Sequence, residues 1–135
     1  MTQLNEPPIK LNDADARKIA ASVIHQAVID LENLCERMRT VKEAWRQKNL
    51  AGLSANFSWP FDREDDNSII DFFDVKTSNM FAFYWEILDM DMAGGLPYKL
   101  RRMINAAKEY KGWMRGPDID EDIKKAKKAS RKEVI

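Results

Sequence analysis

The sequence is poor in the residues that most protein chemistry requires. Among its 135 residues there is one cysteine, Cys35, and one histidine, His25. A disulfide within the chain needs two cysteines, and a zinc site needs several clustered Cys or His ligands, so we expect neither. The usual catalytic triads cannot be assembled from these residues either. We therefore predict no metal, no cofactor and no enzymatic activity.

Loops that bind phosphates or calcium are missing as well. Gly94 and Gly95 stand together, but the further glycines and the Lys-Ser/Thr pair of a nucleotide-binding loop are absent. The acidic run 118–122 opens like a calcium loop. However, Ile123 stands where that loop requires glycine, and Ala129 stands where it requires a bidentate glutamate. Both kinds of loop are thus excluded.

Long apolar runs are also lacking. No run approaches the roughly 18 residues that a membrane span needs. The residues that follow Met1 are polar and include Pro7 and Pro8, so the basic region and apolar core of a secretory signal are absent. We expect no membrane partner and a cytoplasmic location.

Net charge is the last feature that the chain lacks, since 22 basic residues balance 22 acidic ones. The two signs are nevertheless separated along the sequence. Residues 62–91 hold nine acids against two bases, whereas residues 99–111 hold five bases against one acid. One acidic and one basic region are therefore predicted, and each could meet a different partner.

The strongest pattern that is present is a heptad seam in the first third of the chain. A helix starts at Asn12, and apolar residues then recur at intervals of three and four: Ala20, Ile24, Ala27, Leu31, Leu34, Met38, Val41 and Trp45. Flanking apolar residues widen the stripe, which favours packing against other helices of the same fold. The alternative is a homodimer through Ala20, Ile24, Leu31, Leu34 and Met38.

The rest of the chain predicts further helices. We expect an extended N-terminal arm (1–11), a single helical domain (12–115) and a charged C-terminal helix or tail (116–135). The fold class is all-α, a small helical bundle with one long N-terminal helix and a helix-turn-helix-like pair. The connection from Gln47 to Asn67 contains large apolar residues, so it should lie folded over the core.

An acidic stretch follows this connection. We interpret the run from Asp62 to Asp66 as an exposed tip, and the next segment as a short helix that is capped by Asn67 or Ser68 and buries Ile69, Phe72 and Phe73. A solvated surface is the simpler interpretation of the acids. The alternative is an acidic interaction surface made of Asp62, Glu64, Asp65, Asp66, Asp71 and Asp74.

Two helices then follow one another. The first contains Phe81, Phe83 and Trp85 and is apolar nearly all round, which is typical of a central core helix. The second places its apolar residues on one face and its polar residues on an outward strip. The members of this strip are Tyr98, Arg101, Arg102, Asn105 and Lys108. Such residues can bond to phosphates and base edges, although an ordinary solvated face would look the same.

This pair of helices carries a family resemblance. At Ile70-Asp71-Phe72-Phe73, Phe81, Trp85-Glu86-Ile87-Leu88, Asp91 and Leu100-Arg101-Arg102-Met103-Ile104, the chain resembles small uncharacterised helical proteins encoded by phages and prophages. The resemblance implies DNA binding through the pair, with Arg101 and Arg102 on the nucleic acid, and a location in the host cytoplasm. The turn from Asp89 to Leu96 is longer than that of a compact helix-turn-helix.

Two functional hypotheses follow. The first is a phage-type DNA-binding or regulatory protein, dimeric, that uses the strip from Tyr98 to Lys108. The second is a non-enzymatic interaction protein, such as an inhibitor of a host nucleoprotein, whose acidic surface occupies a basic site on the host protein.

Overall fold

The computed structural model describes residues 13–74, 80–88 and 97–134, and in the last helix it describes side chains as far as Ala129. Within these ranges the chain forms helices and no strand. The elements are α1 (Asp13–Arg46), the 3₁₀ turn η2 (Leu50–Gly52), α2 (Glu64–Phe73), α3 (Met80–Ile87), α4 (Tyr98–Met114) and α5 (Pro117–Val134). The prediction of an all-α fold with one long N-terminal helix is confirmed. The predicted arm, residues 1–11, and Asn12 lie outside the described residues.

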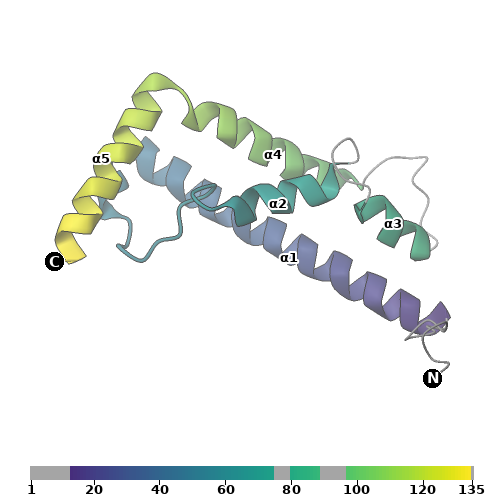
Figure 1. Cartoon of the computed structure of the whole chain (residues 1–135). Coiled ribbons are helices and arrows are strands. Elements are labelled where there is room, and N and C mark those ends of the chain that lie inside the picture. Colours follow the sequence, from purple (N-terminus) through teal and green to yellow (C-terminus); the bar gives the residue numbers. More distant parts are fainter. Residues whose placement is uncertain (1–12, 75–79, 89–96, 135) are drawn as a thin grey trace.

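Helix α1 is the axis on which the other elements are arranged (Figure 1). Helices α2, α3 and α4 each pack against α1, and η2 folds back on its C-terminal end. Helix α2 runs opposite to α1, whereas α4 runs in the same general direction as α1. At the far end α5 crosses the bundle, where it packs against η2 and α4.

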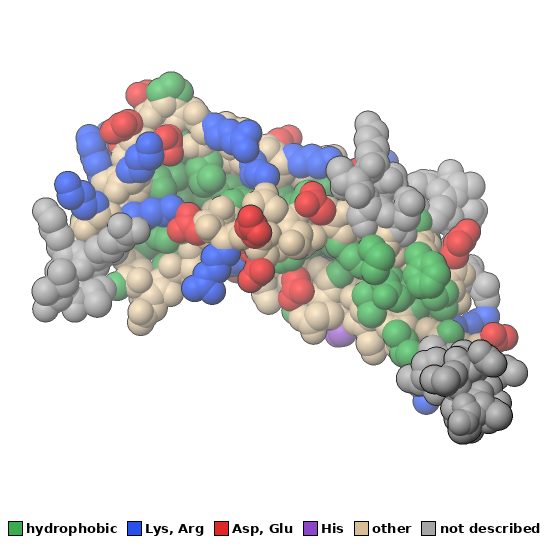
Figure 2. Space-filling model, viewed as in Figure 1, with side chains coloured by type: hydrophobic (Ala, Val, Ile, Leu, Met, Phe, Trp, Pro, Cys, Tyr) green, Lys and Arg blue, Asp and Glu red, His purple; other side chains and the backbone are tan. Residues whose placement is uncertain are grey.

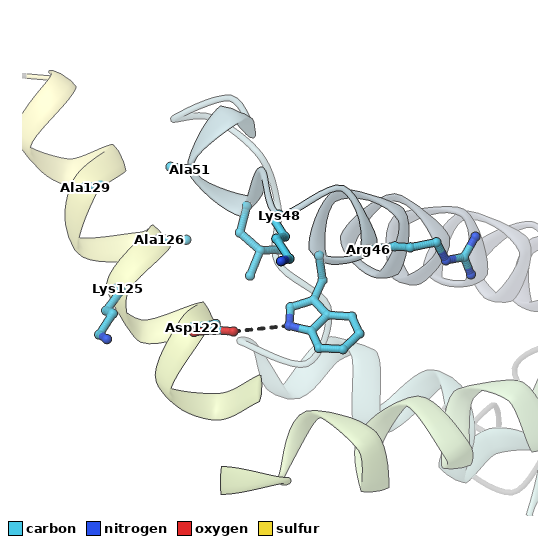
Figure 3. A pocket seen from close by; sticks show the side chains of 9 residues that line it. Arg46, Lys48, Ala51, Asp122, Lys125, Ala126 and Ala129 are labelled. Atoms are coloured by element: carbon cyan, nitrogen blue, oxygen red, sulfur yellow. Dashed lines mark hydrogen bonds between the residues drawn. The ribbon is translucent and has the colours of Figure 1, made fainter. Parts of the chain in front are cut away.

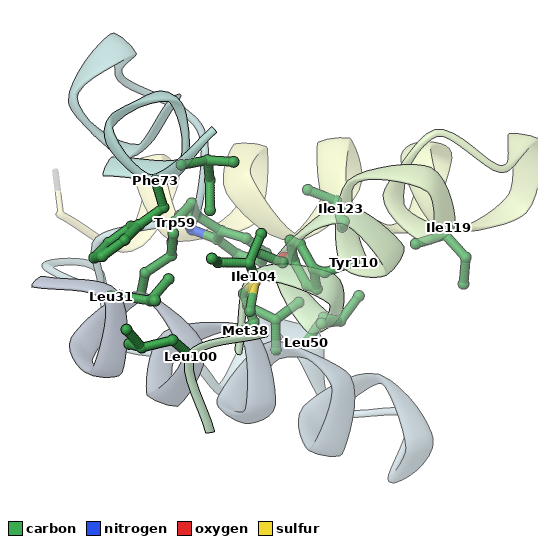
Figure 4. Packing of buried hydrophobic residues seen from close by; sticks show 14 of the residues in the cluster. Leu31, Met38, Leu50, Trp59, Phe73, Leu100, Ile104, Tyr110, Ile119 and Ile123 are labelled. Carbon is green, nitrogen blue, oxygen red and sulfur yellow. The ribbon is translucent and has the colours of Figure 1, made fainter. Parts of the chain in front are cut away.

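The heptad seam is the buried face of α1. Its buried members are Ala20, Ile24, Leu31, Leu34, Met38 and Val41. Leu31 and Met38 pack with Leu100 and Ile104 of α4 in one apolar cluster (Figure 4). Removing each large apolar side chain from water stabilises the fold by roughly 1.5–3 kcal/mol. The seam is thus buried by other elements of the same chain, whereas the alternative of a homodimer through Ala20, Ile24, Leu31, Leu34 and Met38 stays a prediction.

Helix α1 ends in a Schellman motif. The amide of Asn49 donates to the carbonyl of Ala44 (2.8 Å), and the amide of Lys48 donates to the carbonyl of Trp45 (2.9 Å). Lys48 occupies the left-handed position of this motif, with φ of 56°. The motif satisfies the last carbonyls of α1 and turns the chain into η2, where Leu50 is buried.

The connection between α1 and α2 lies against the core, as predicted. Leu50 and Trp59 are buried, while Leu53, Phe57 and Phe61 are half-buried and pack on the same cluster. The following helix begins at Glu64, which is earlier than the predicted caps. Its acidic first turn suits the positive end of a helix. Ile70 and Phe73 are its buried apolar residues, and the predicted Ile69 and Phe72 are half-buried.

Helix α3 differs from the prediction of a central core helix. It is only 8 residues long, and Phe81 is its one buried residue. Phe83 is 57% exposed and Met80 is 49% exposed. The helix lies against the N-terminal half of α1, at the edge of the bundle (Figure 1). Its composition indicated burial on all sides, but the fold covers one side, and the centre of the core is formed by α1.

Helix α5 is a well-packed helix. Ile119, Ile123 and Ala126 are buried and belong to the same apolar cluster as the seam of α1. Their spacing of four and three places them on one face of the helix. The acids Asp118 and Asp120 occupy the first turn, where the helix dipole favours negative charge. One narrow apolar stripe is thus enough to join this segment to the bundle.

Candidate nucleic-acid interface

Helix α4 has a buried face and an exposed face. Leu100, Ile104, Ala107 and Tyr110 are buried and Met103 is half-buried, in agreement with the prediction that the apolar residues of this helix share one face. The predicted outward strip is exposed at every position: Tyr98, Arg101, Arg102, Asn105 and Lys108. We call these five residues the α4 strip. Basic side chains are visible along α4 in the space-filling view (Figure 2).

The cations of α4 fall into two groups. Two of them bond to neighbouring helices: the Nζ of Lys99 lies 3.7 Å from Glu32 Oε1 on α1, and the Nζ of Lys111 donates to Asn67 Oδ1 on α2 (2.6 Å). By contrast, Arg101, Arg102 and Lys108 have no carboxylate partner within 4.0 Å in the part of the chain that the structure describes. Three positive charges of the strip therefore face solvent without a counter-charge from the described residues.

The guanidinium groups of Arg101 and Arg102 both lie close to the Tyr98 ring at the start of the strip. The Cζ atoms of Arg101 and Arg102 lie 5.9 Å and 5.7 Å from the centre of the Tyr98 ring, within the range of cation–π attraction. The ring itself is 67% exposed. One exposed aromatic face and two guanidinium planes thus gather within the first two turns of α4. This combination can stack on bases and bind phosphates.

The two helices of the predicted helix-turn-helix-like pair are consecutive in the sequence, but among the described residues they do not pack against each other. Helices α3 and α4 follow one another, and each packs against α1 and α2. No close approach joins α3 to α4 among the described residues. The turn between them, Asp89 to Leu96, lies outside these residues. The exposed face of α4 is therefore positioned by α1, α2 and α5.

The predicted acidic surface is divided by the fold. Glu64, Asp65 and Asp71 are exposed on α2, and none of the three has a basic partner among the described residues. The carboxylate of Asp62 accepts a hydrogen bond from Lys127 of α5. Asp74 is half-buried and is not a free carboxylate, because it interacts with another group.

Asp66 corrects the prediction of an exposed acidic tip. It is 6% exposed and bonds to Arg37 of α1. Burial by itself would raise the pKa of this carboxyl group. The hydrogen bonds from Arg37 and from the Phe61 amide, together with the charge of Arg37, outweigh that effect and lower the pKa below its usual value. Asp66 is therefore an internal ionised group and cannot belong to an interaction surface.

Sequence reasoning missed a groove where three distant segments meet. It is formed by the end of α1, by η2 and by the middle of α5, and it contains Trp45, Leu50 and Ala126. The one sequence signal was the series Asp122, Ala126 and Ala129, which shares one face of α5. A second groove lies between α1 and α2 and includes Val23, Phe72, Asp30 and Asp65.

The described residues contain no group of three or more His, Cys, Asp or Glu side chains that could hold a metal ion. None of the helices in the described ranges is long and apolar enough to cross a membrane. No protein-family model, no curated protein and no solved structure matches this chain.

Proposed function

We propose that the protein is a small DNA-binding or regulatory protein that contacts the nucleic acid through the α4 strip. The observation that carries this proposal is that Arg101, Arg102 and Lys108 project from one exposed helical face without a carboxylate partner among the described residues. Cations of this kind are available to phosphates, and each phosphate contact releases condensed counterions from DNA.

The composition of the strip supports a role beyond charge. Arginine can form bidentate hydrogen bonds to guanine, and asparagine can form them to adenine. Asn105 lies one turn after Arg101 and Arg102, so the three side chains occupy neighbouring positions on the helix. Tyr98 adds an aromatic ring at the start of the same face. A phage origin, which the resemblance implies, remains part of this proposal.

Binding of a fluorescently labelled mixed-sequence duplex, followed by anisotropy, tests the proposal. We expect affinity to fall steeply between about 50 and 200 mM salt. The double variant Arg101→Ala/Arg102→Ala should bind more weakly and should flatten the slope of log affinity against log salt by up to about two units. Circular dichroism would verify that the variant keeps its helices, which is expected because both side chains are exposed.

The matched control is Arg39→Ala/Arg46→Ala, which changes the net charge by the same amount. These two arginines are exposed on α1, and each pairs with a glutamate three residues earlier. Their removal should leave both the affinity and the salt slope close to those of the parent protein. Equal losses in the two double variants would show that net charge, and not the α4 strip, governs binding. Unchanged binding by the Arg101→Ala/Arg102→Ala variant would overturn the proposal.

A second candidate is an interaction protein that binds a basic protein partner through α2. The observation that favours it is that Glu64, Asp65 and Asp71 are exposed on α2, and that Asp65 lines the groove between α1 and α2. This surface is narrower than the sequence predicted, because Asp62 is paired and Asp66 is buried. Two results together would favour this candidate. The protein would not bind a duplex at low salt, and it would capture a basic host protein. The variant Glu64→Gln/Asp65→Asn/Asp71→Asn should lose that capture.

A further inference from the structure

The groove at the end of the bundle has the size of a small-molecule site. It lies between the C-terminal end of α1, η2 and α5, and its volume is about 710 Å³. Pockets for small ligands usually measure 300–1,000 Å³ and are mostly apolar. Here the apolar lining consists of Trp45, Leu50, Ala51, Ala126 and Ala129. The site lies at the opposite end of α4 from Tyr98 and does not depend on the proposed function.

Trp45 forms a fixed wall of this groove. Its Nε1 donates a hydrogen bond to Asp122 Oδ2 across the groove (3.2 Å), which is drawn as the dashed line in Figure 3. On its other side the indole meets the ring of Trp113 edge to face, with 5.6 Å between centroids. The ring is nevertheless 37% exposed. A large aromatic surface is thus held in place before any ligand arrives, which lowers the cost of binding.

The wall opposite Trp45 consists of alanines, whose small side chains leave the groove open. Ala126 and Ala129 of α5, with Ala51 of η2, line the space that faces the indole (Figure 3). Ala126 is buried, whereas Ala129 is half-buried at the edge. A larger residue at 129 would project into the groove without disturbing the apolar cluster below it. This position therefore offers a way to fill the groove and keep the fold.

The charges on the rim favour an anion. Lys48 and Lys125 line the groove, and neither has a carboxylate partner within 4.0 Å among the described residues. Figure 3 draws Lys48 beside the indole, whereas the side chains of Lys125 and of the third cation, Arg46, point away from it. Arg46 also pairs with Glu43. The single carboxylate of the lining, Asp122, is bonded to the Trp45 N–H group. Lys48 is thus the cation available to a negative group at the mouth.

We propose that this groove binds a small amphipathic anion, namely an aliphatic or aromatic body that carries one carboxylate. The apolar body lies between the Trp45 indole and the alanines of α5. The carboxylate lies at the rim, where Lys48 can pair with it. A neutral molecule with the same body gains the apolar contacts alone, so charge distinguishes the preferred ligand from its neutral counterpart.

Octanoate, with 1-octanol as its neutral counterpart, is a suitable probe pair. A two-dimensional ¹H–¹⁵N NMR titration would follow the indole N–H signal of Trp45, which the Trp45→Phe variant identifies. We expect a saturable shift of this signal with octanoate, and binding of octanol that is weaker by about threefold, because one exposed ion pair contributes roughly that factor. The variant Lys48→Gln should lose this preference for the anion.

Two further variants complete the test. Ala129→Leu should weaken binding of both probes by about tenfold or more, because it fills the groove. Lys124→Gln is the matched control on α5, since Lys124 pairs with Asp120 and does not line the groove, and it should bind octanoate as the parent protein does. Equal affinity for octanoate and octanol, or parental binding by Ala129→Leu, would overturn the proposal. An indole signal that shifts with protein concentration alone would also overturn it, because a second copy of the chain would then occupy the groove.

Discussion

Arg37 of α1 and Asp66 of α2 form a bidentate ion pair where these two helices meet. Nη2 of Arg37 donates to Oδ1 (2.7 Å), and Nη1 donates to Oδ2 (3.1 Å). Oδ2 also accepts a hydrogen bond from the backbone amide of Phe61 (2.7 Å). Phe61 has φ of 65°, a left-handed conformation that is unfavourable for a bulky residue. The pair thus joins two helices and holds a strained residue between them.

Removing one partner of this pair should destabilise the protein. In Asp66→Ala the amide of Phe61 loses its acceptor, and the guanidinium of Arg37 loses its carboxylate and keeps only the long hydrogen bonds to Ser58 (3.4 Å). We expect the free energy of unfolding to fall by about 3 kcal/mol, the low end for breaking a buried pair, because the Arg37 side chain is 23% exposed. Urea unfolding measures this change. The control Asp65→Ala removes the adjacent exposed carboxylate and should stay within about 0.5 kcal/mol of the parent; equal losses would contradict the assignment.

The same carboxylate predicts a dependence of stability on pH. The pKa of Asp66 is lower in the folded protein than in the unfolded chain. Its contribution to stability is therefore present above the unfolded pKa, about 3.9, and is lost as pH falls through the lower folded value. We expect the stability difference between the parent protein and Asp66→Asn to be largest near neutral pH and to shrink below about pH 4. A difference that stays constant down to pH 2 would argue against an ionised Asp66.

Tyr110 offers a stabilising substitution. Tyr110 is 1% exposed, and its ring stacks on Phe61 and packs at a tilt against Trp113, but its hydroxyl group has no hydrogen-bond partner among the described residues. A buried hydroxyl without a partner bears a desolvation cost. Tyr110→Phe keeps the ring and removes that cost, so we expect thermal unfolding to show equal or higher stability, by up to about 1 kcal/mol. A loss of 1 kcal/mol or more would show that the hydroxyl group is bonded in solution.

Lys48 tests the Schellman motif at the end of α1. Its φ of 56° is disfavoured for residues that carry a Cβ atom. Lys48→Gly should raise the free energy of unfolding by roughly 0.5–1 kcal/mol, seen as a higher urea midpoint with an unchanged slope. Lys48→Ala is the matched control, because it removes the same charge and keeps Cβ. If glycine and alanine behave alike, the gain does not come from the backbone conformation.

The faces of the two amphipathic helices could be predicted because their residues repeat at the helical period. Leu31, Leu34 and Met38 mark the buried side of α1, and the alternation of Leu100 and Ile104 with Arg101 and Arg102 marks both sides of α4. Position on a face depends on nearest neighbours in sequence. The exposure of the α4 strip was therefore predictable, whereas its ability to bind DNA remains a proposal.

Features that depend on distant segments could not be predicted. Asp66 lies in a run of acids, and its partner Arg37 is 29 residues away on another helix. Phe83 resembles Phe81 in type and surroundings along the chain, yet the fold covers Phe81 and leaves Phe83 more than half exposed. The groove at Trp45 requires α5 to cross the end of α1. Each of these outcomes depends on tertiary packing, and the local periodicity of the sequence carries no information about that packing.

The central place of α1 has a consequence for synthesis of the chain. The apolar face of α1 is covered in part by α4, and about fifty residues separate Arg46 from Tyr98. At roughly 5–20 residues per second, the ribosome needs several seconds to deliver the covering helix. During this interval the part of the seam that α4 covers is exposed on the nascent chain, although η2, α2 and α3 are made earlier and pack on other parts of α1. Two unfinished chains could pair along the uncovered part until α4 docks on it.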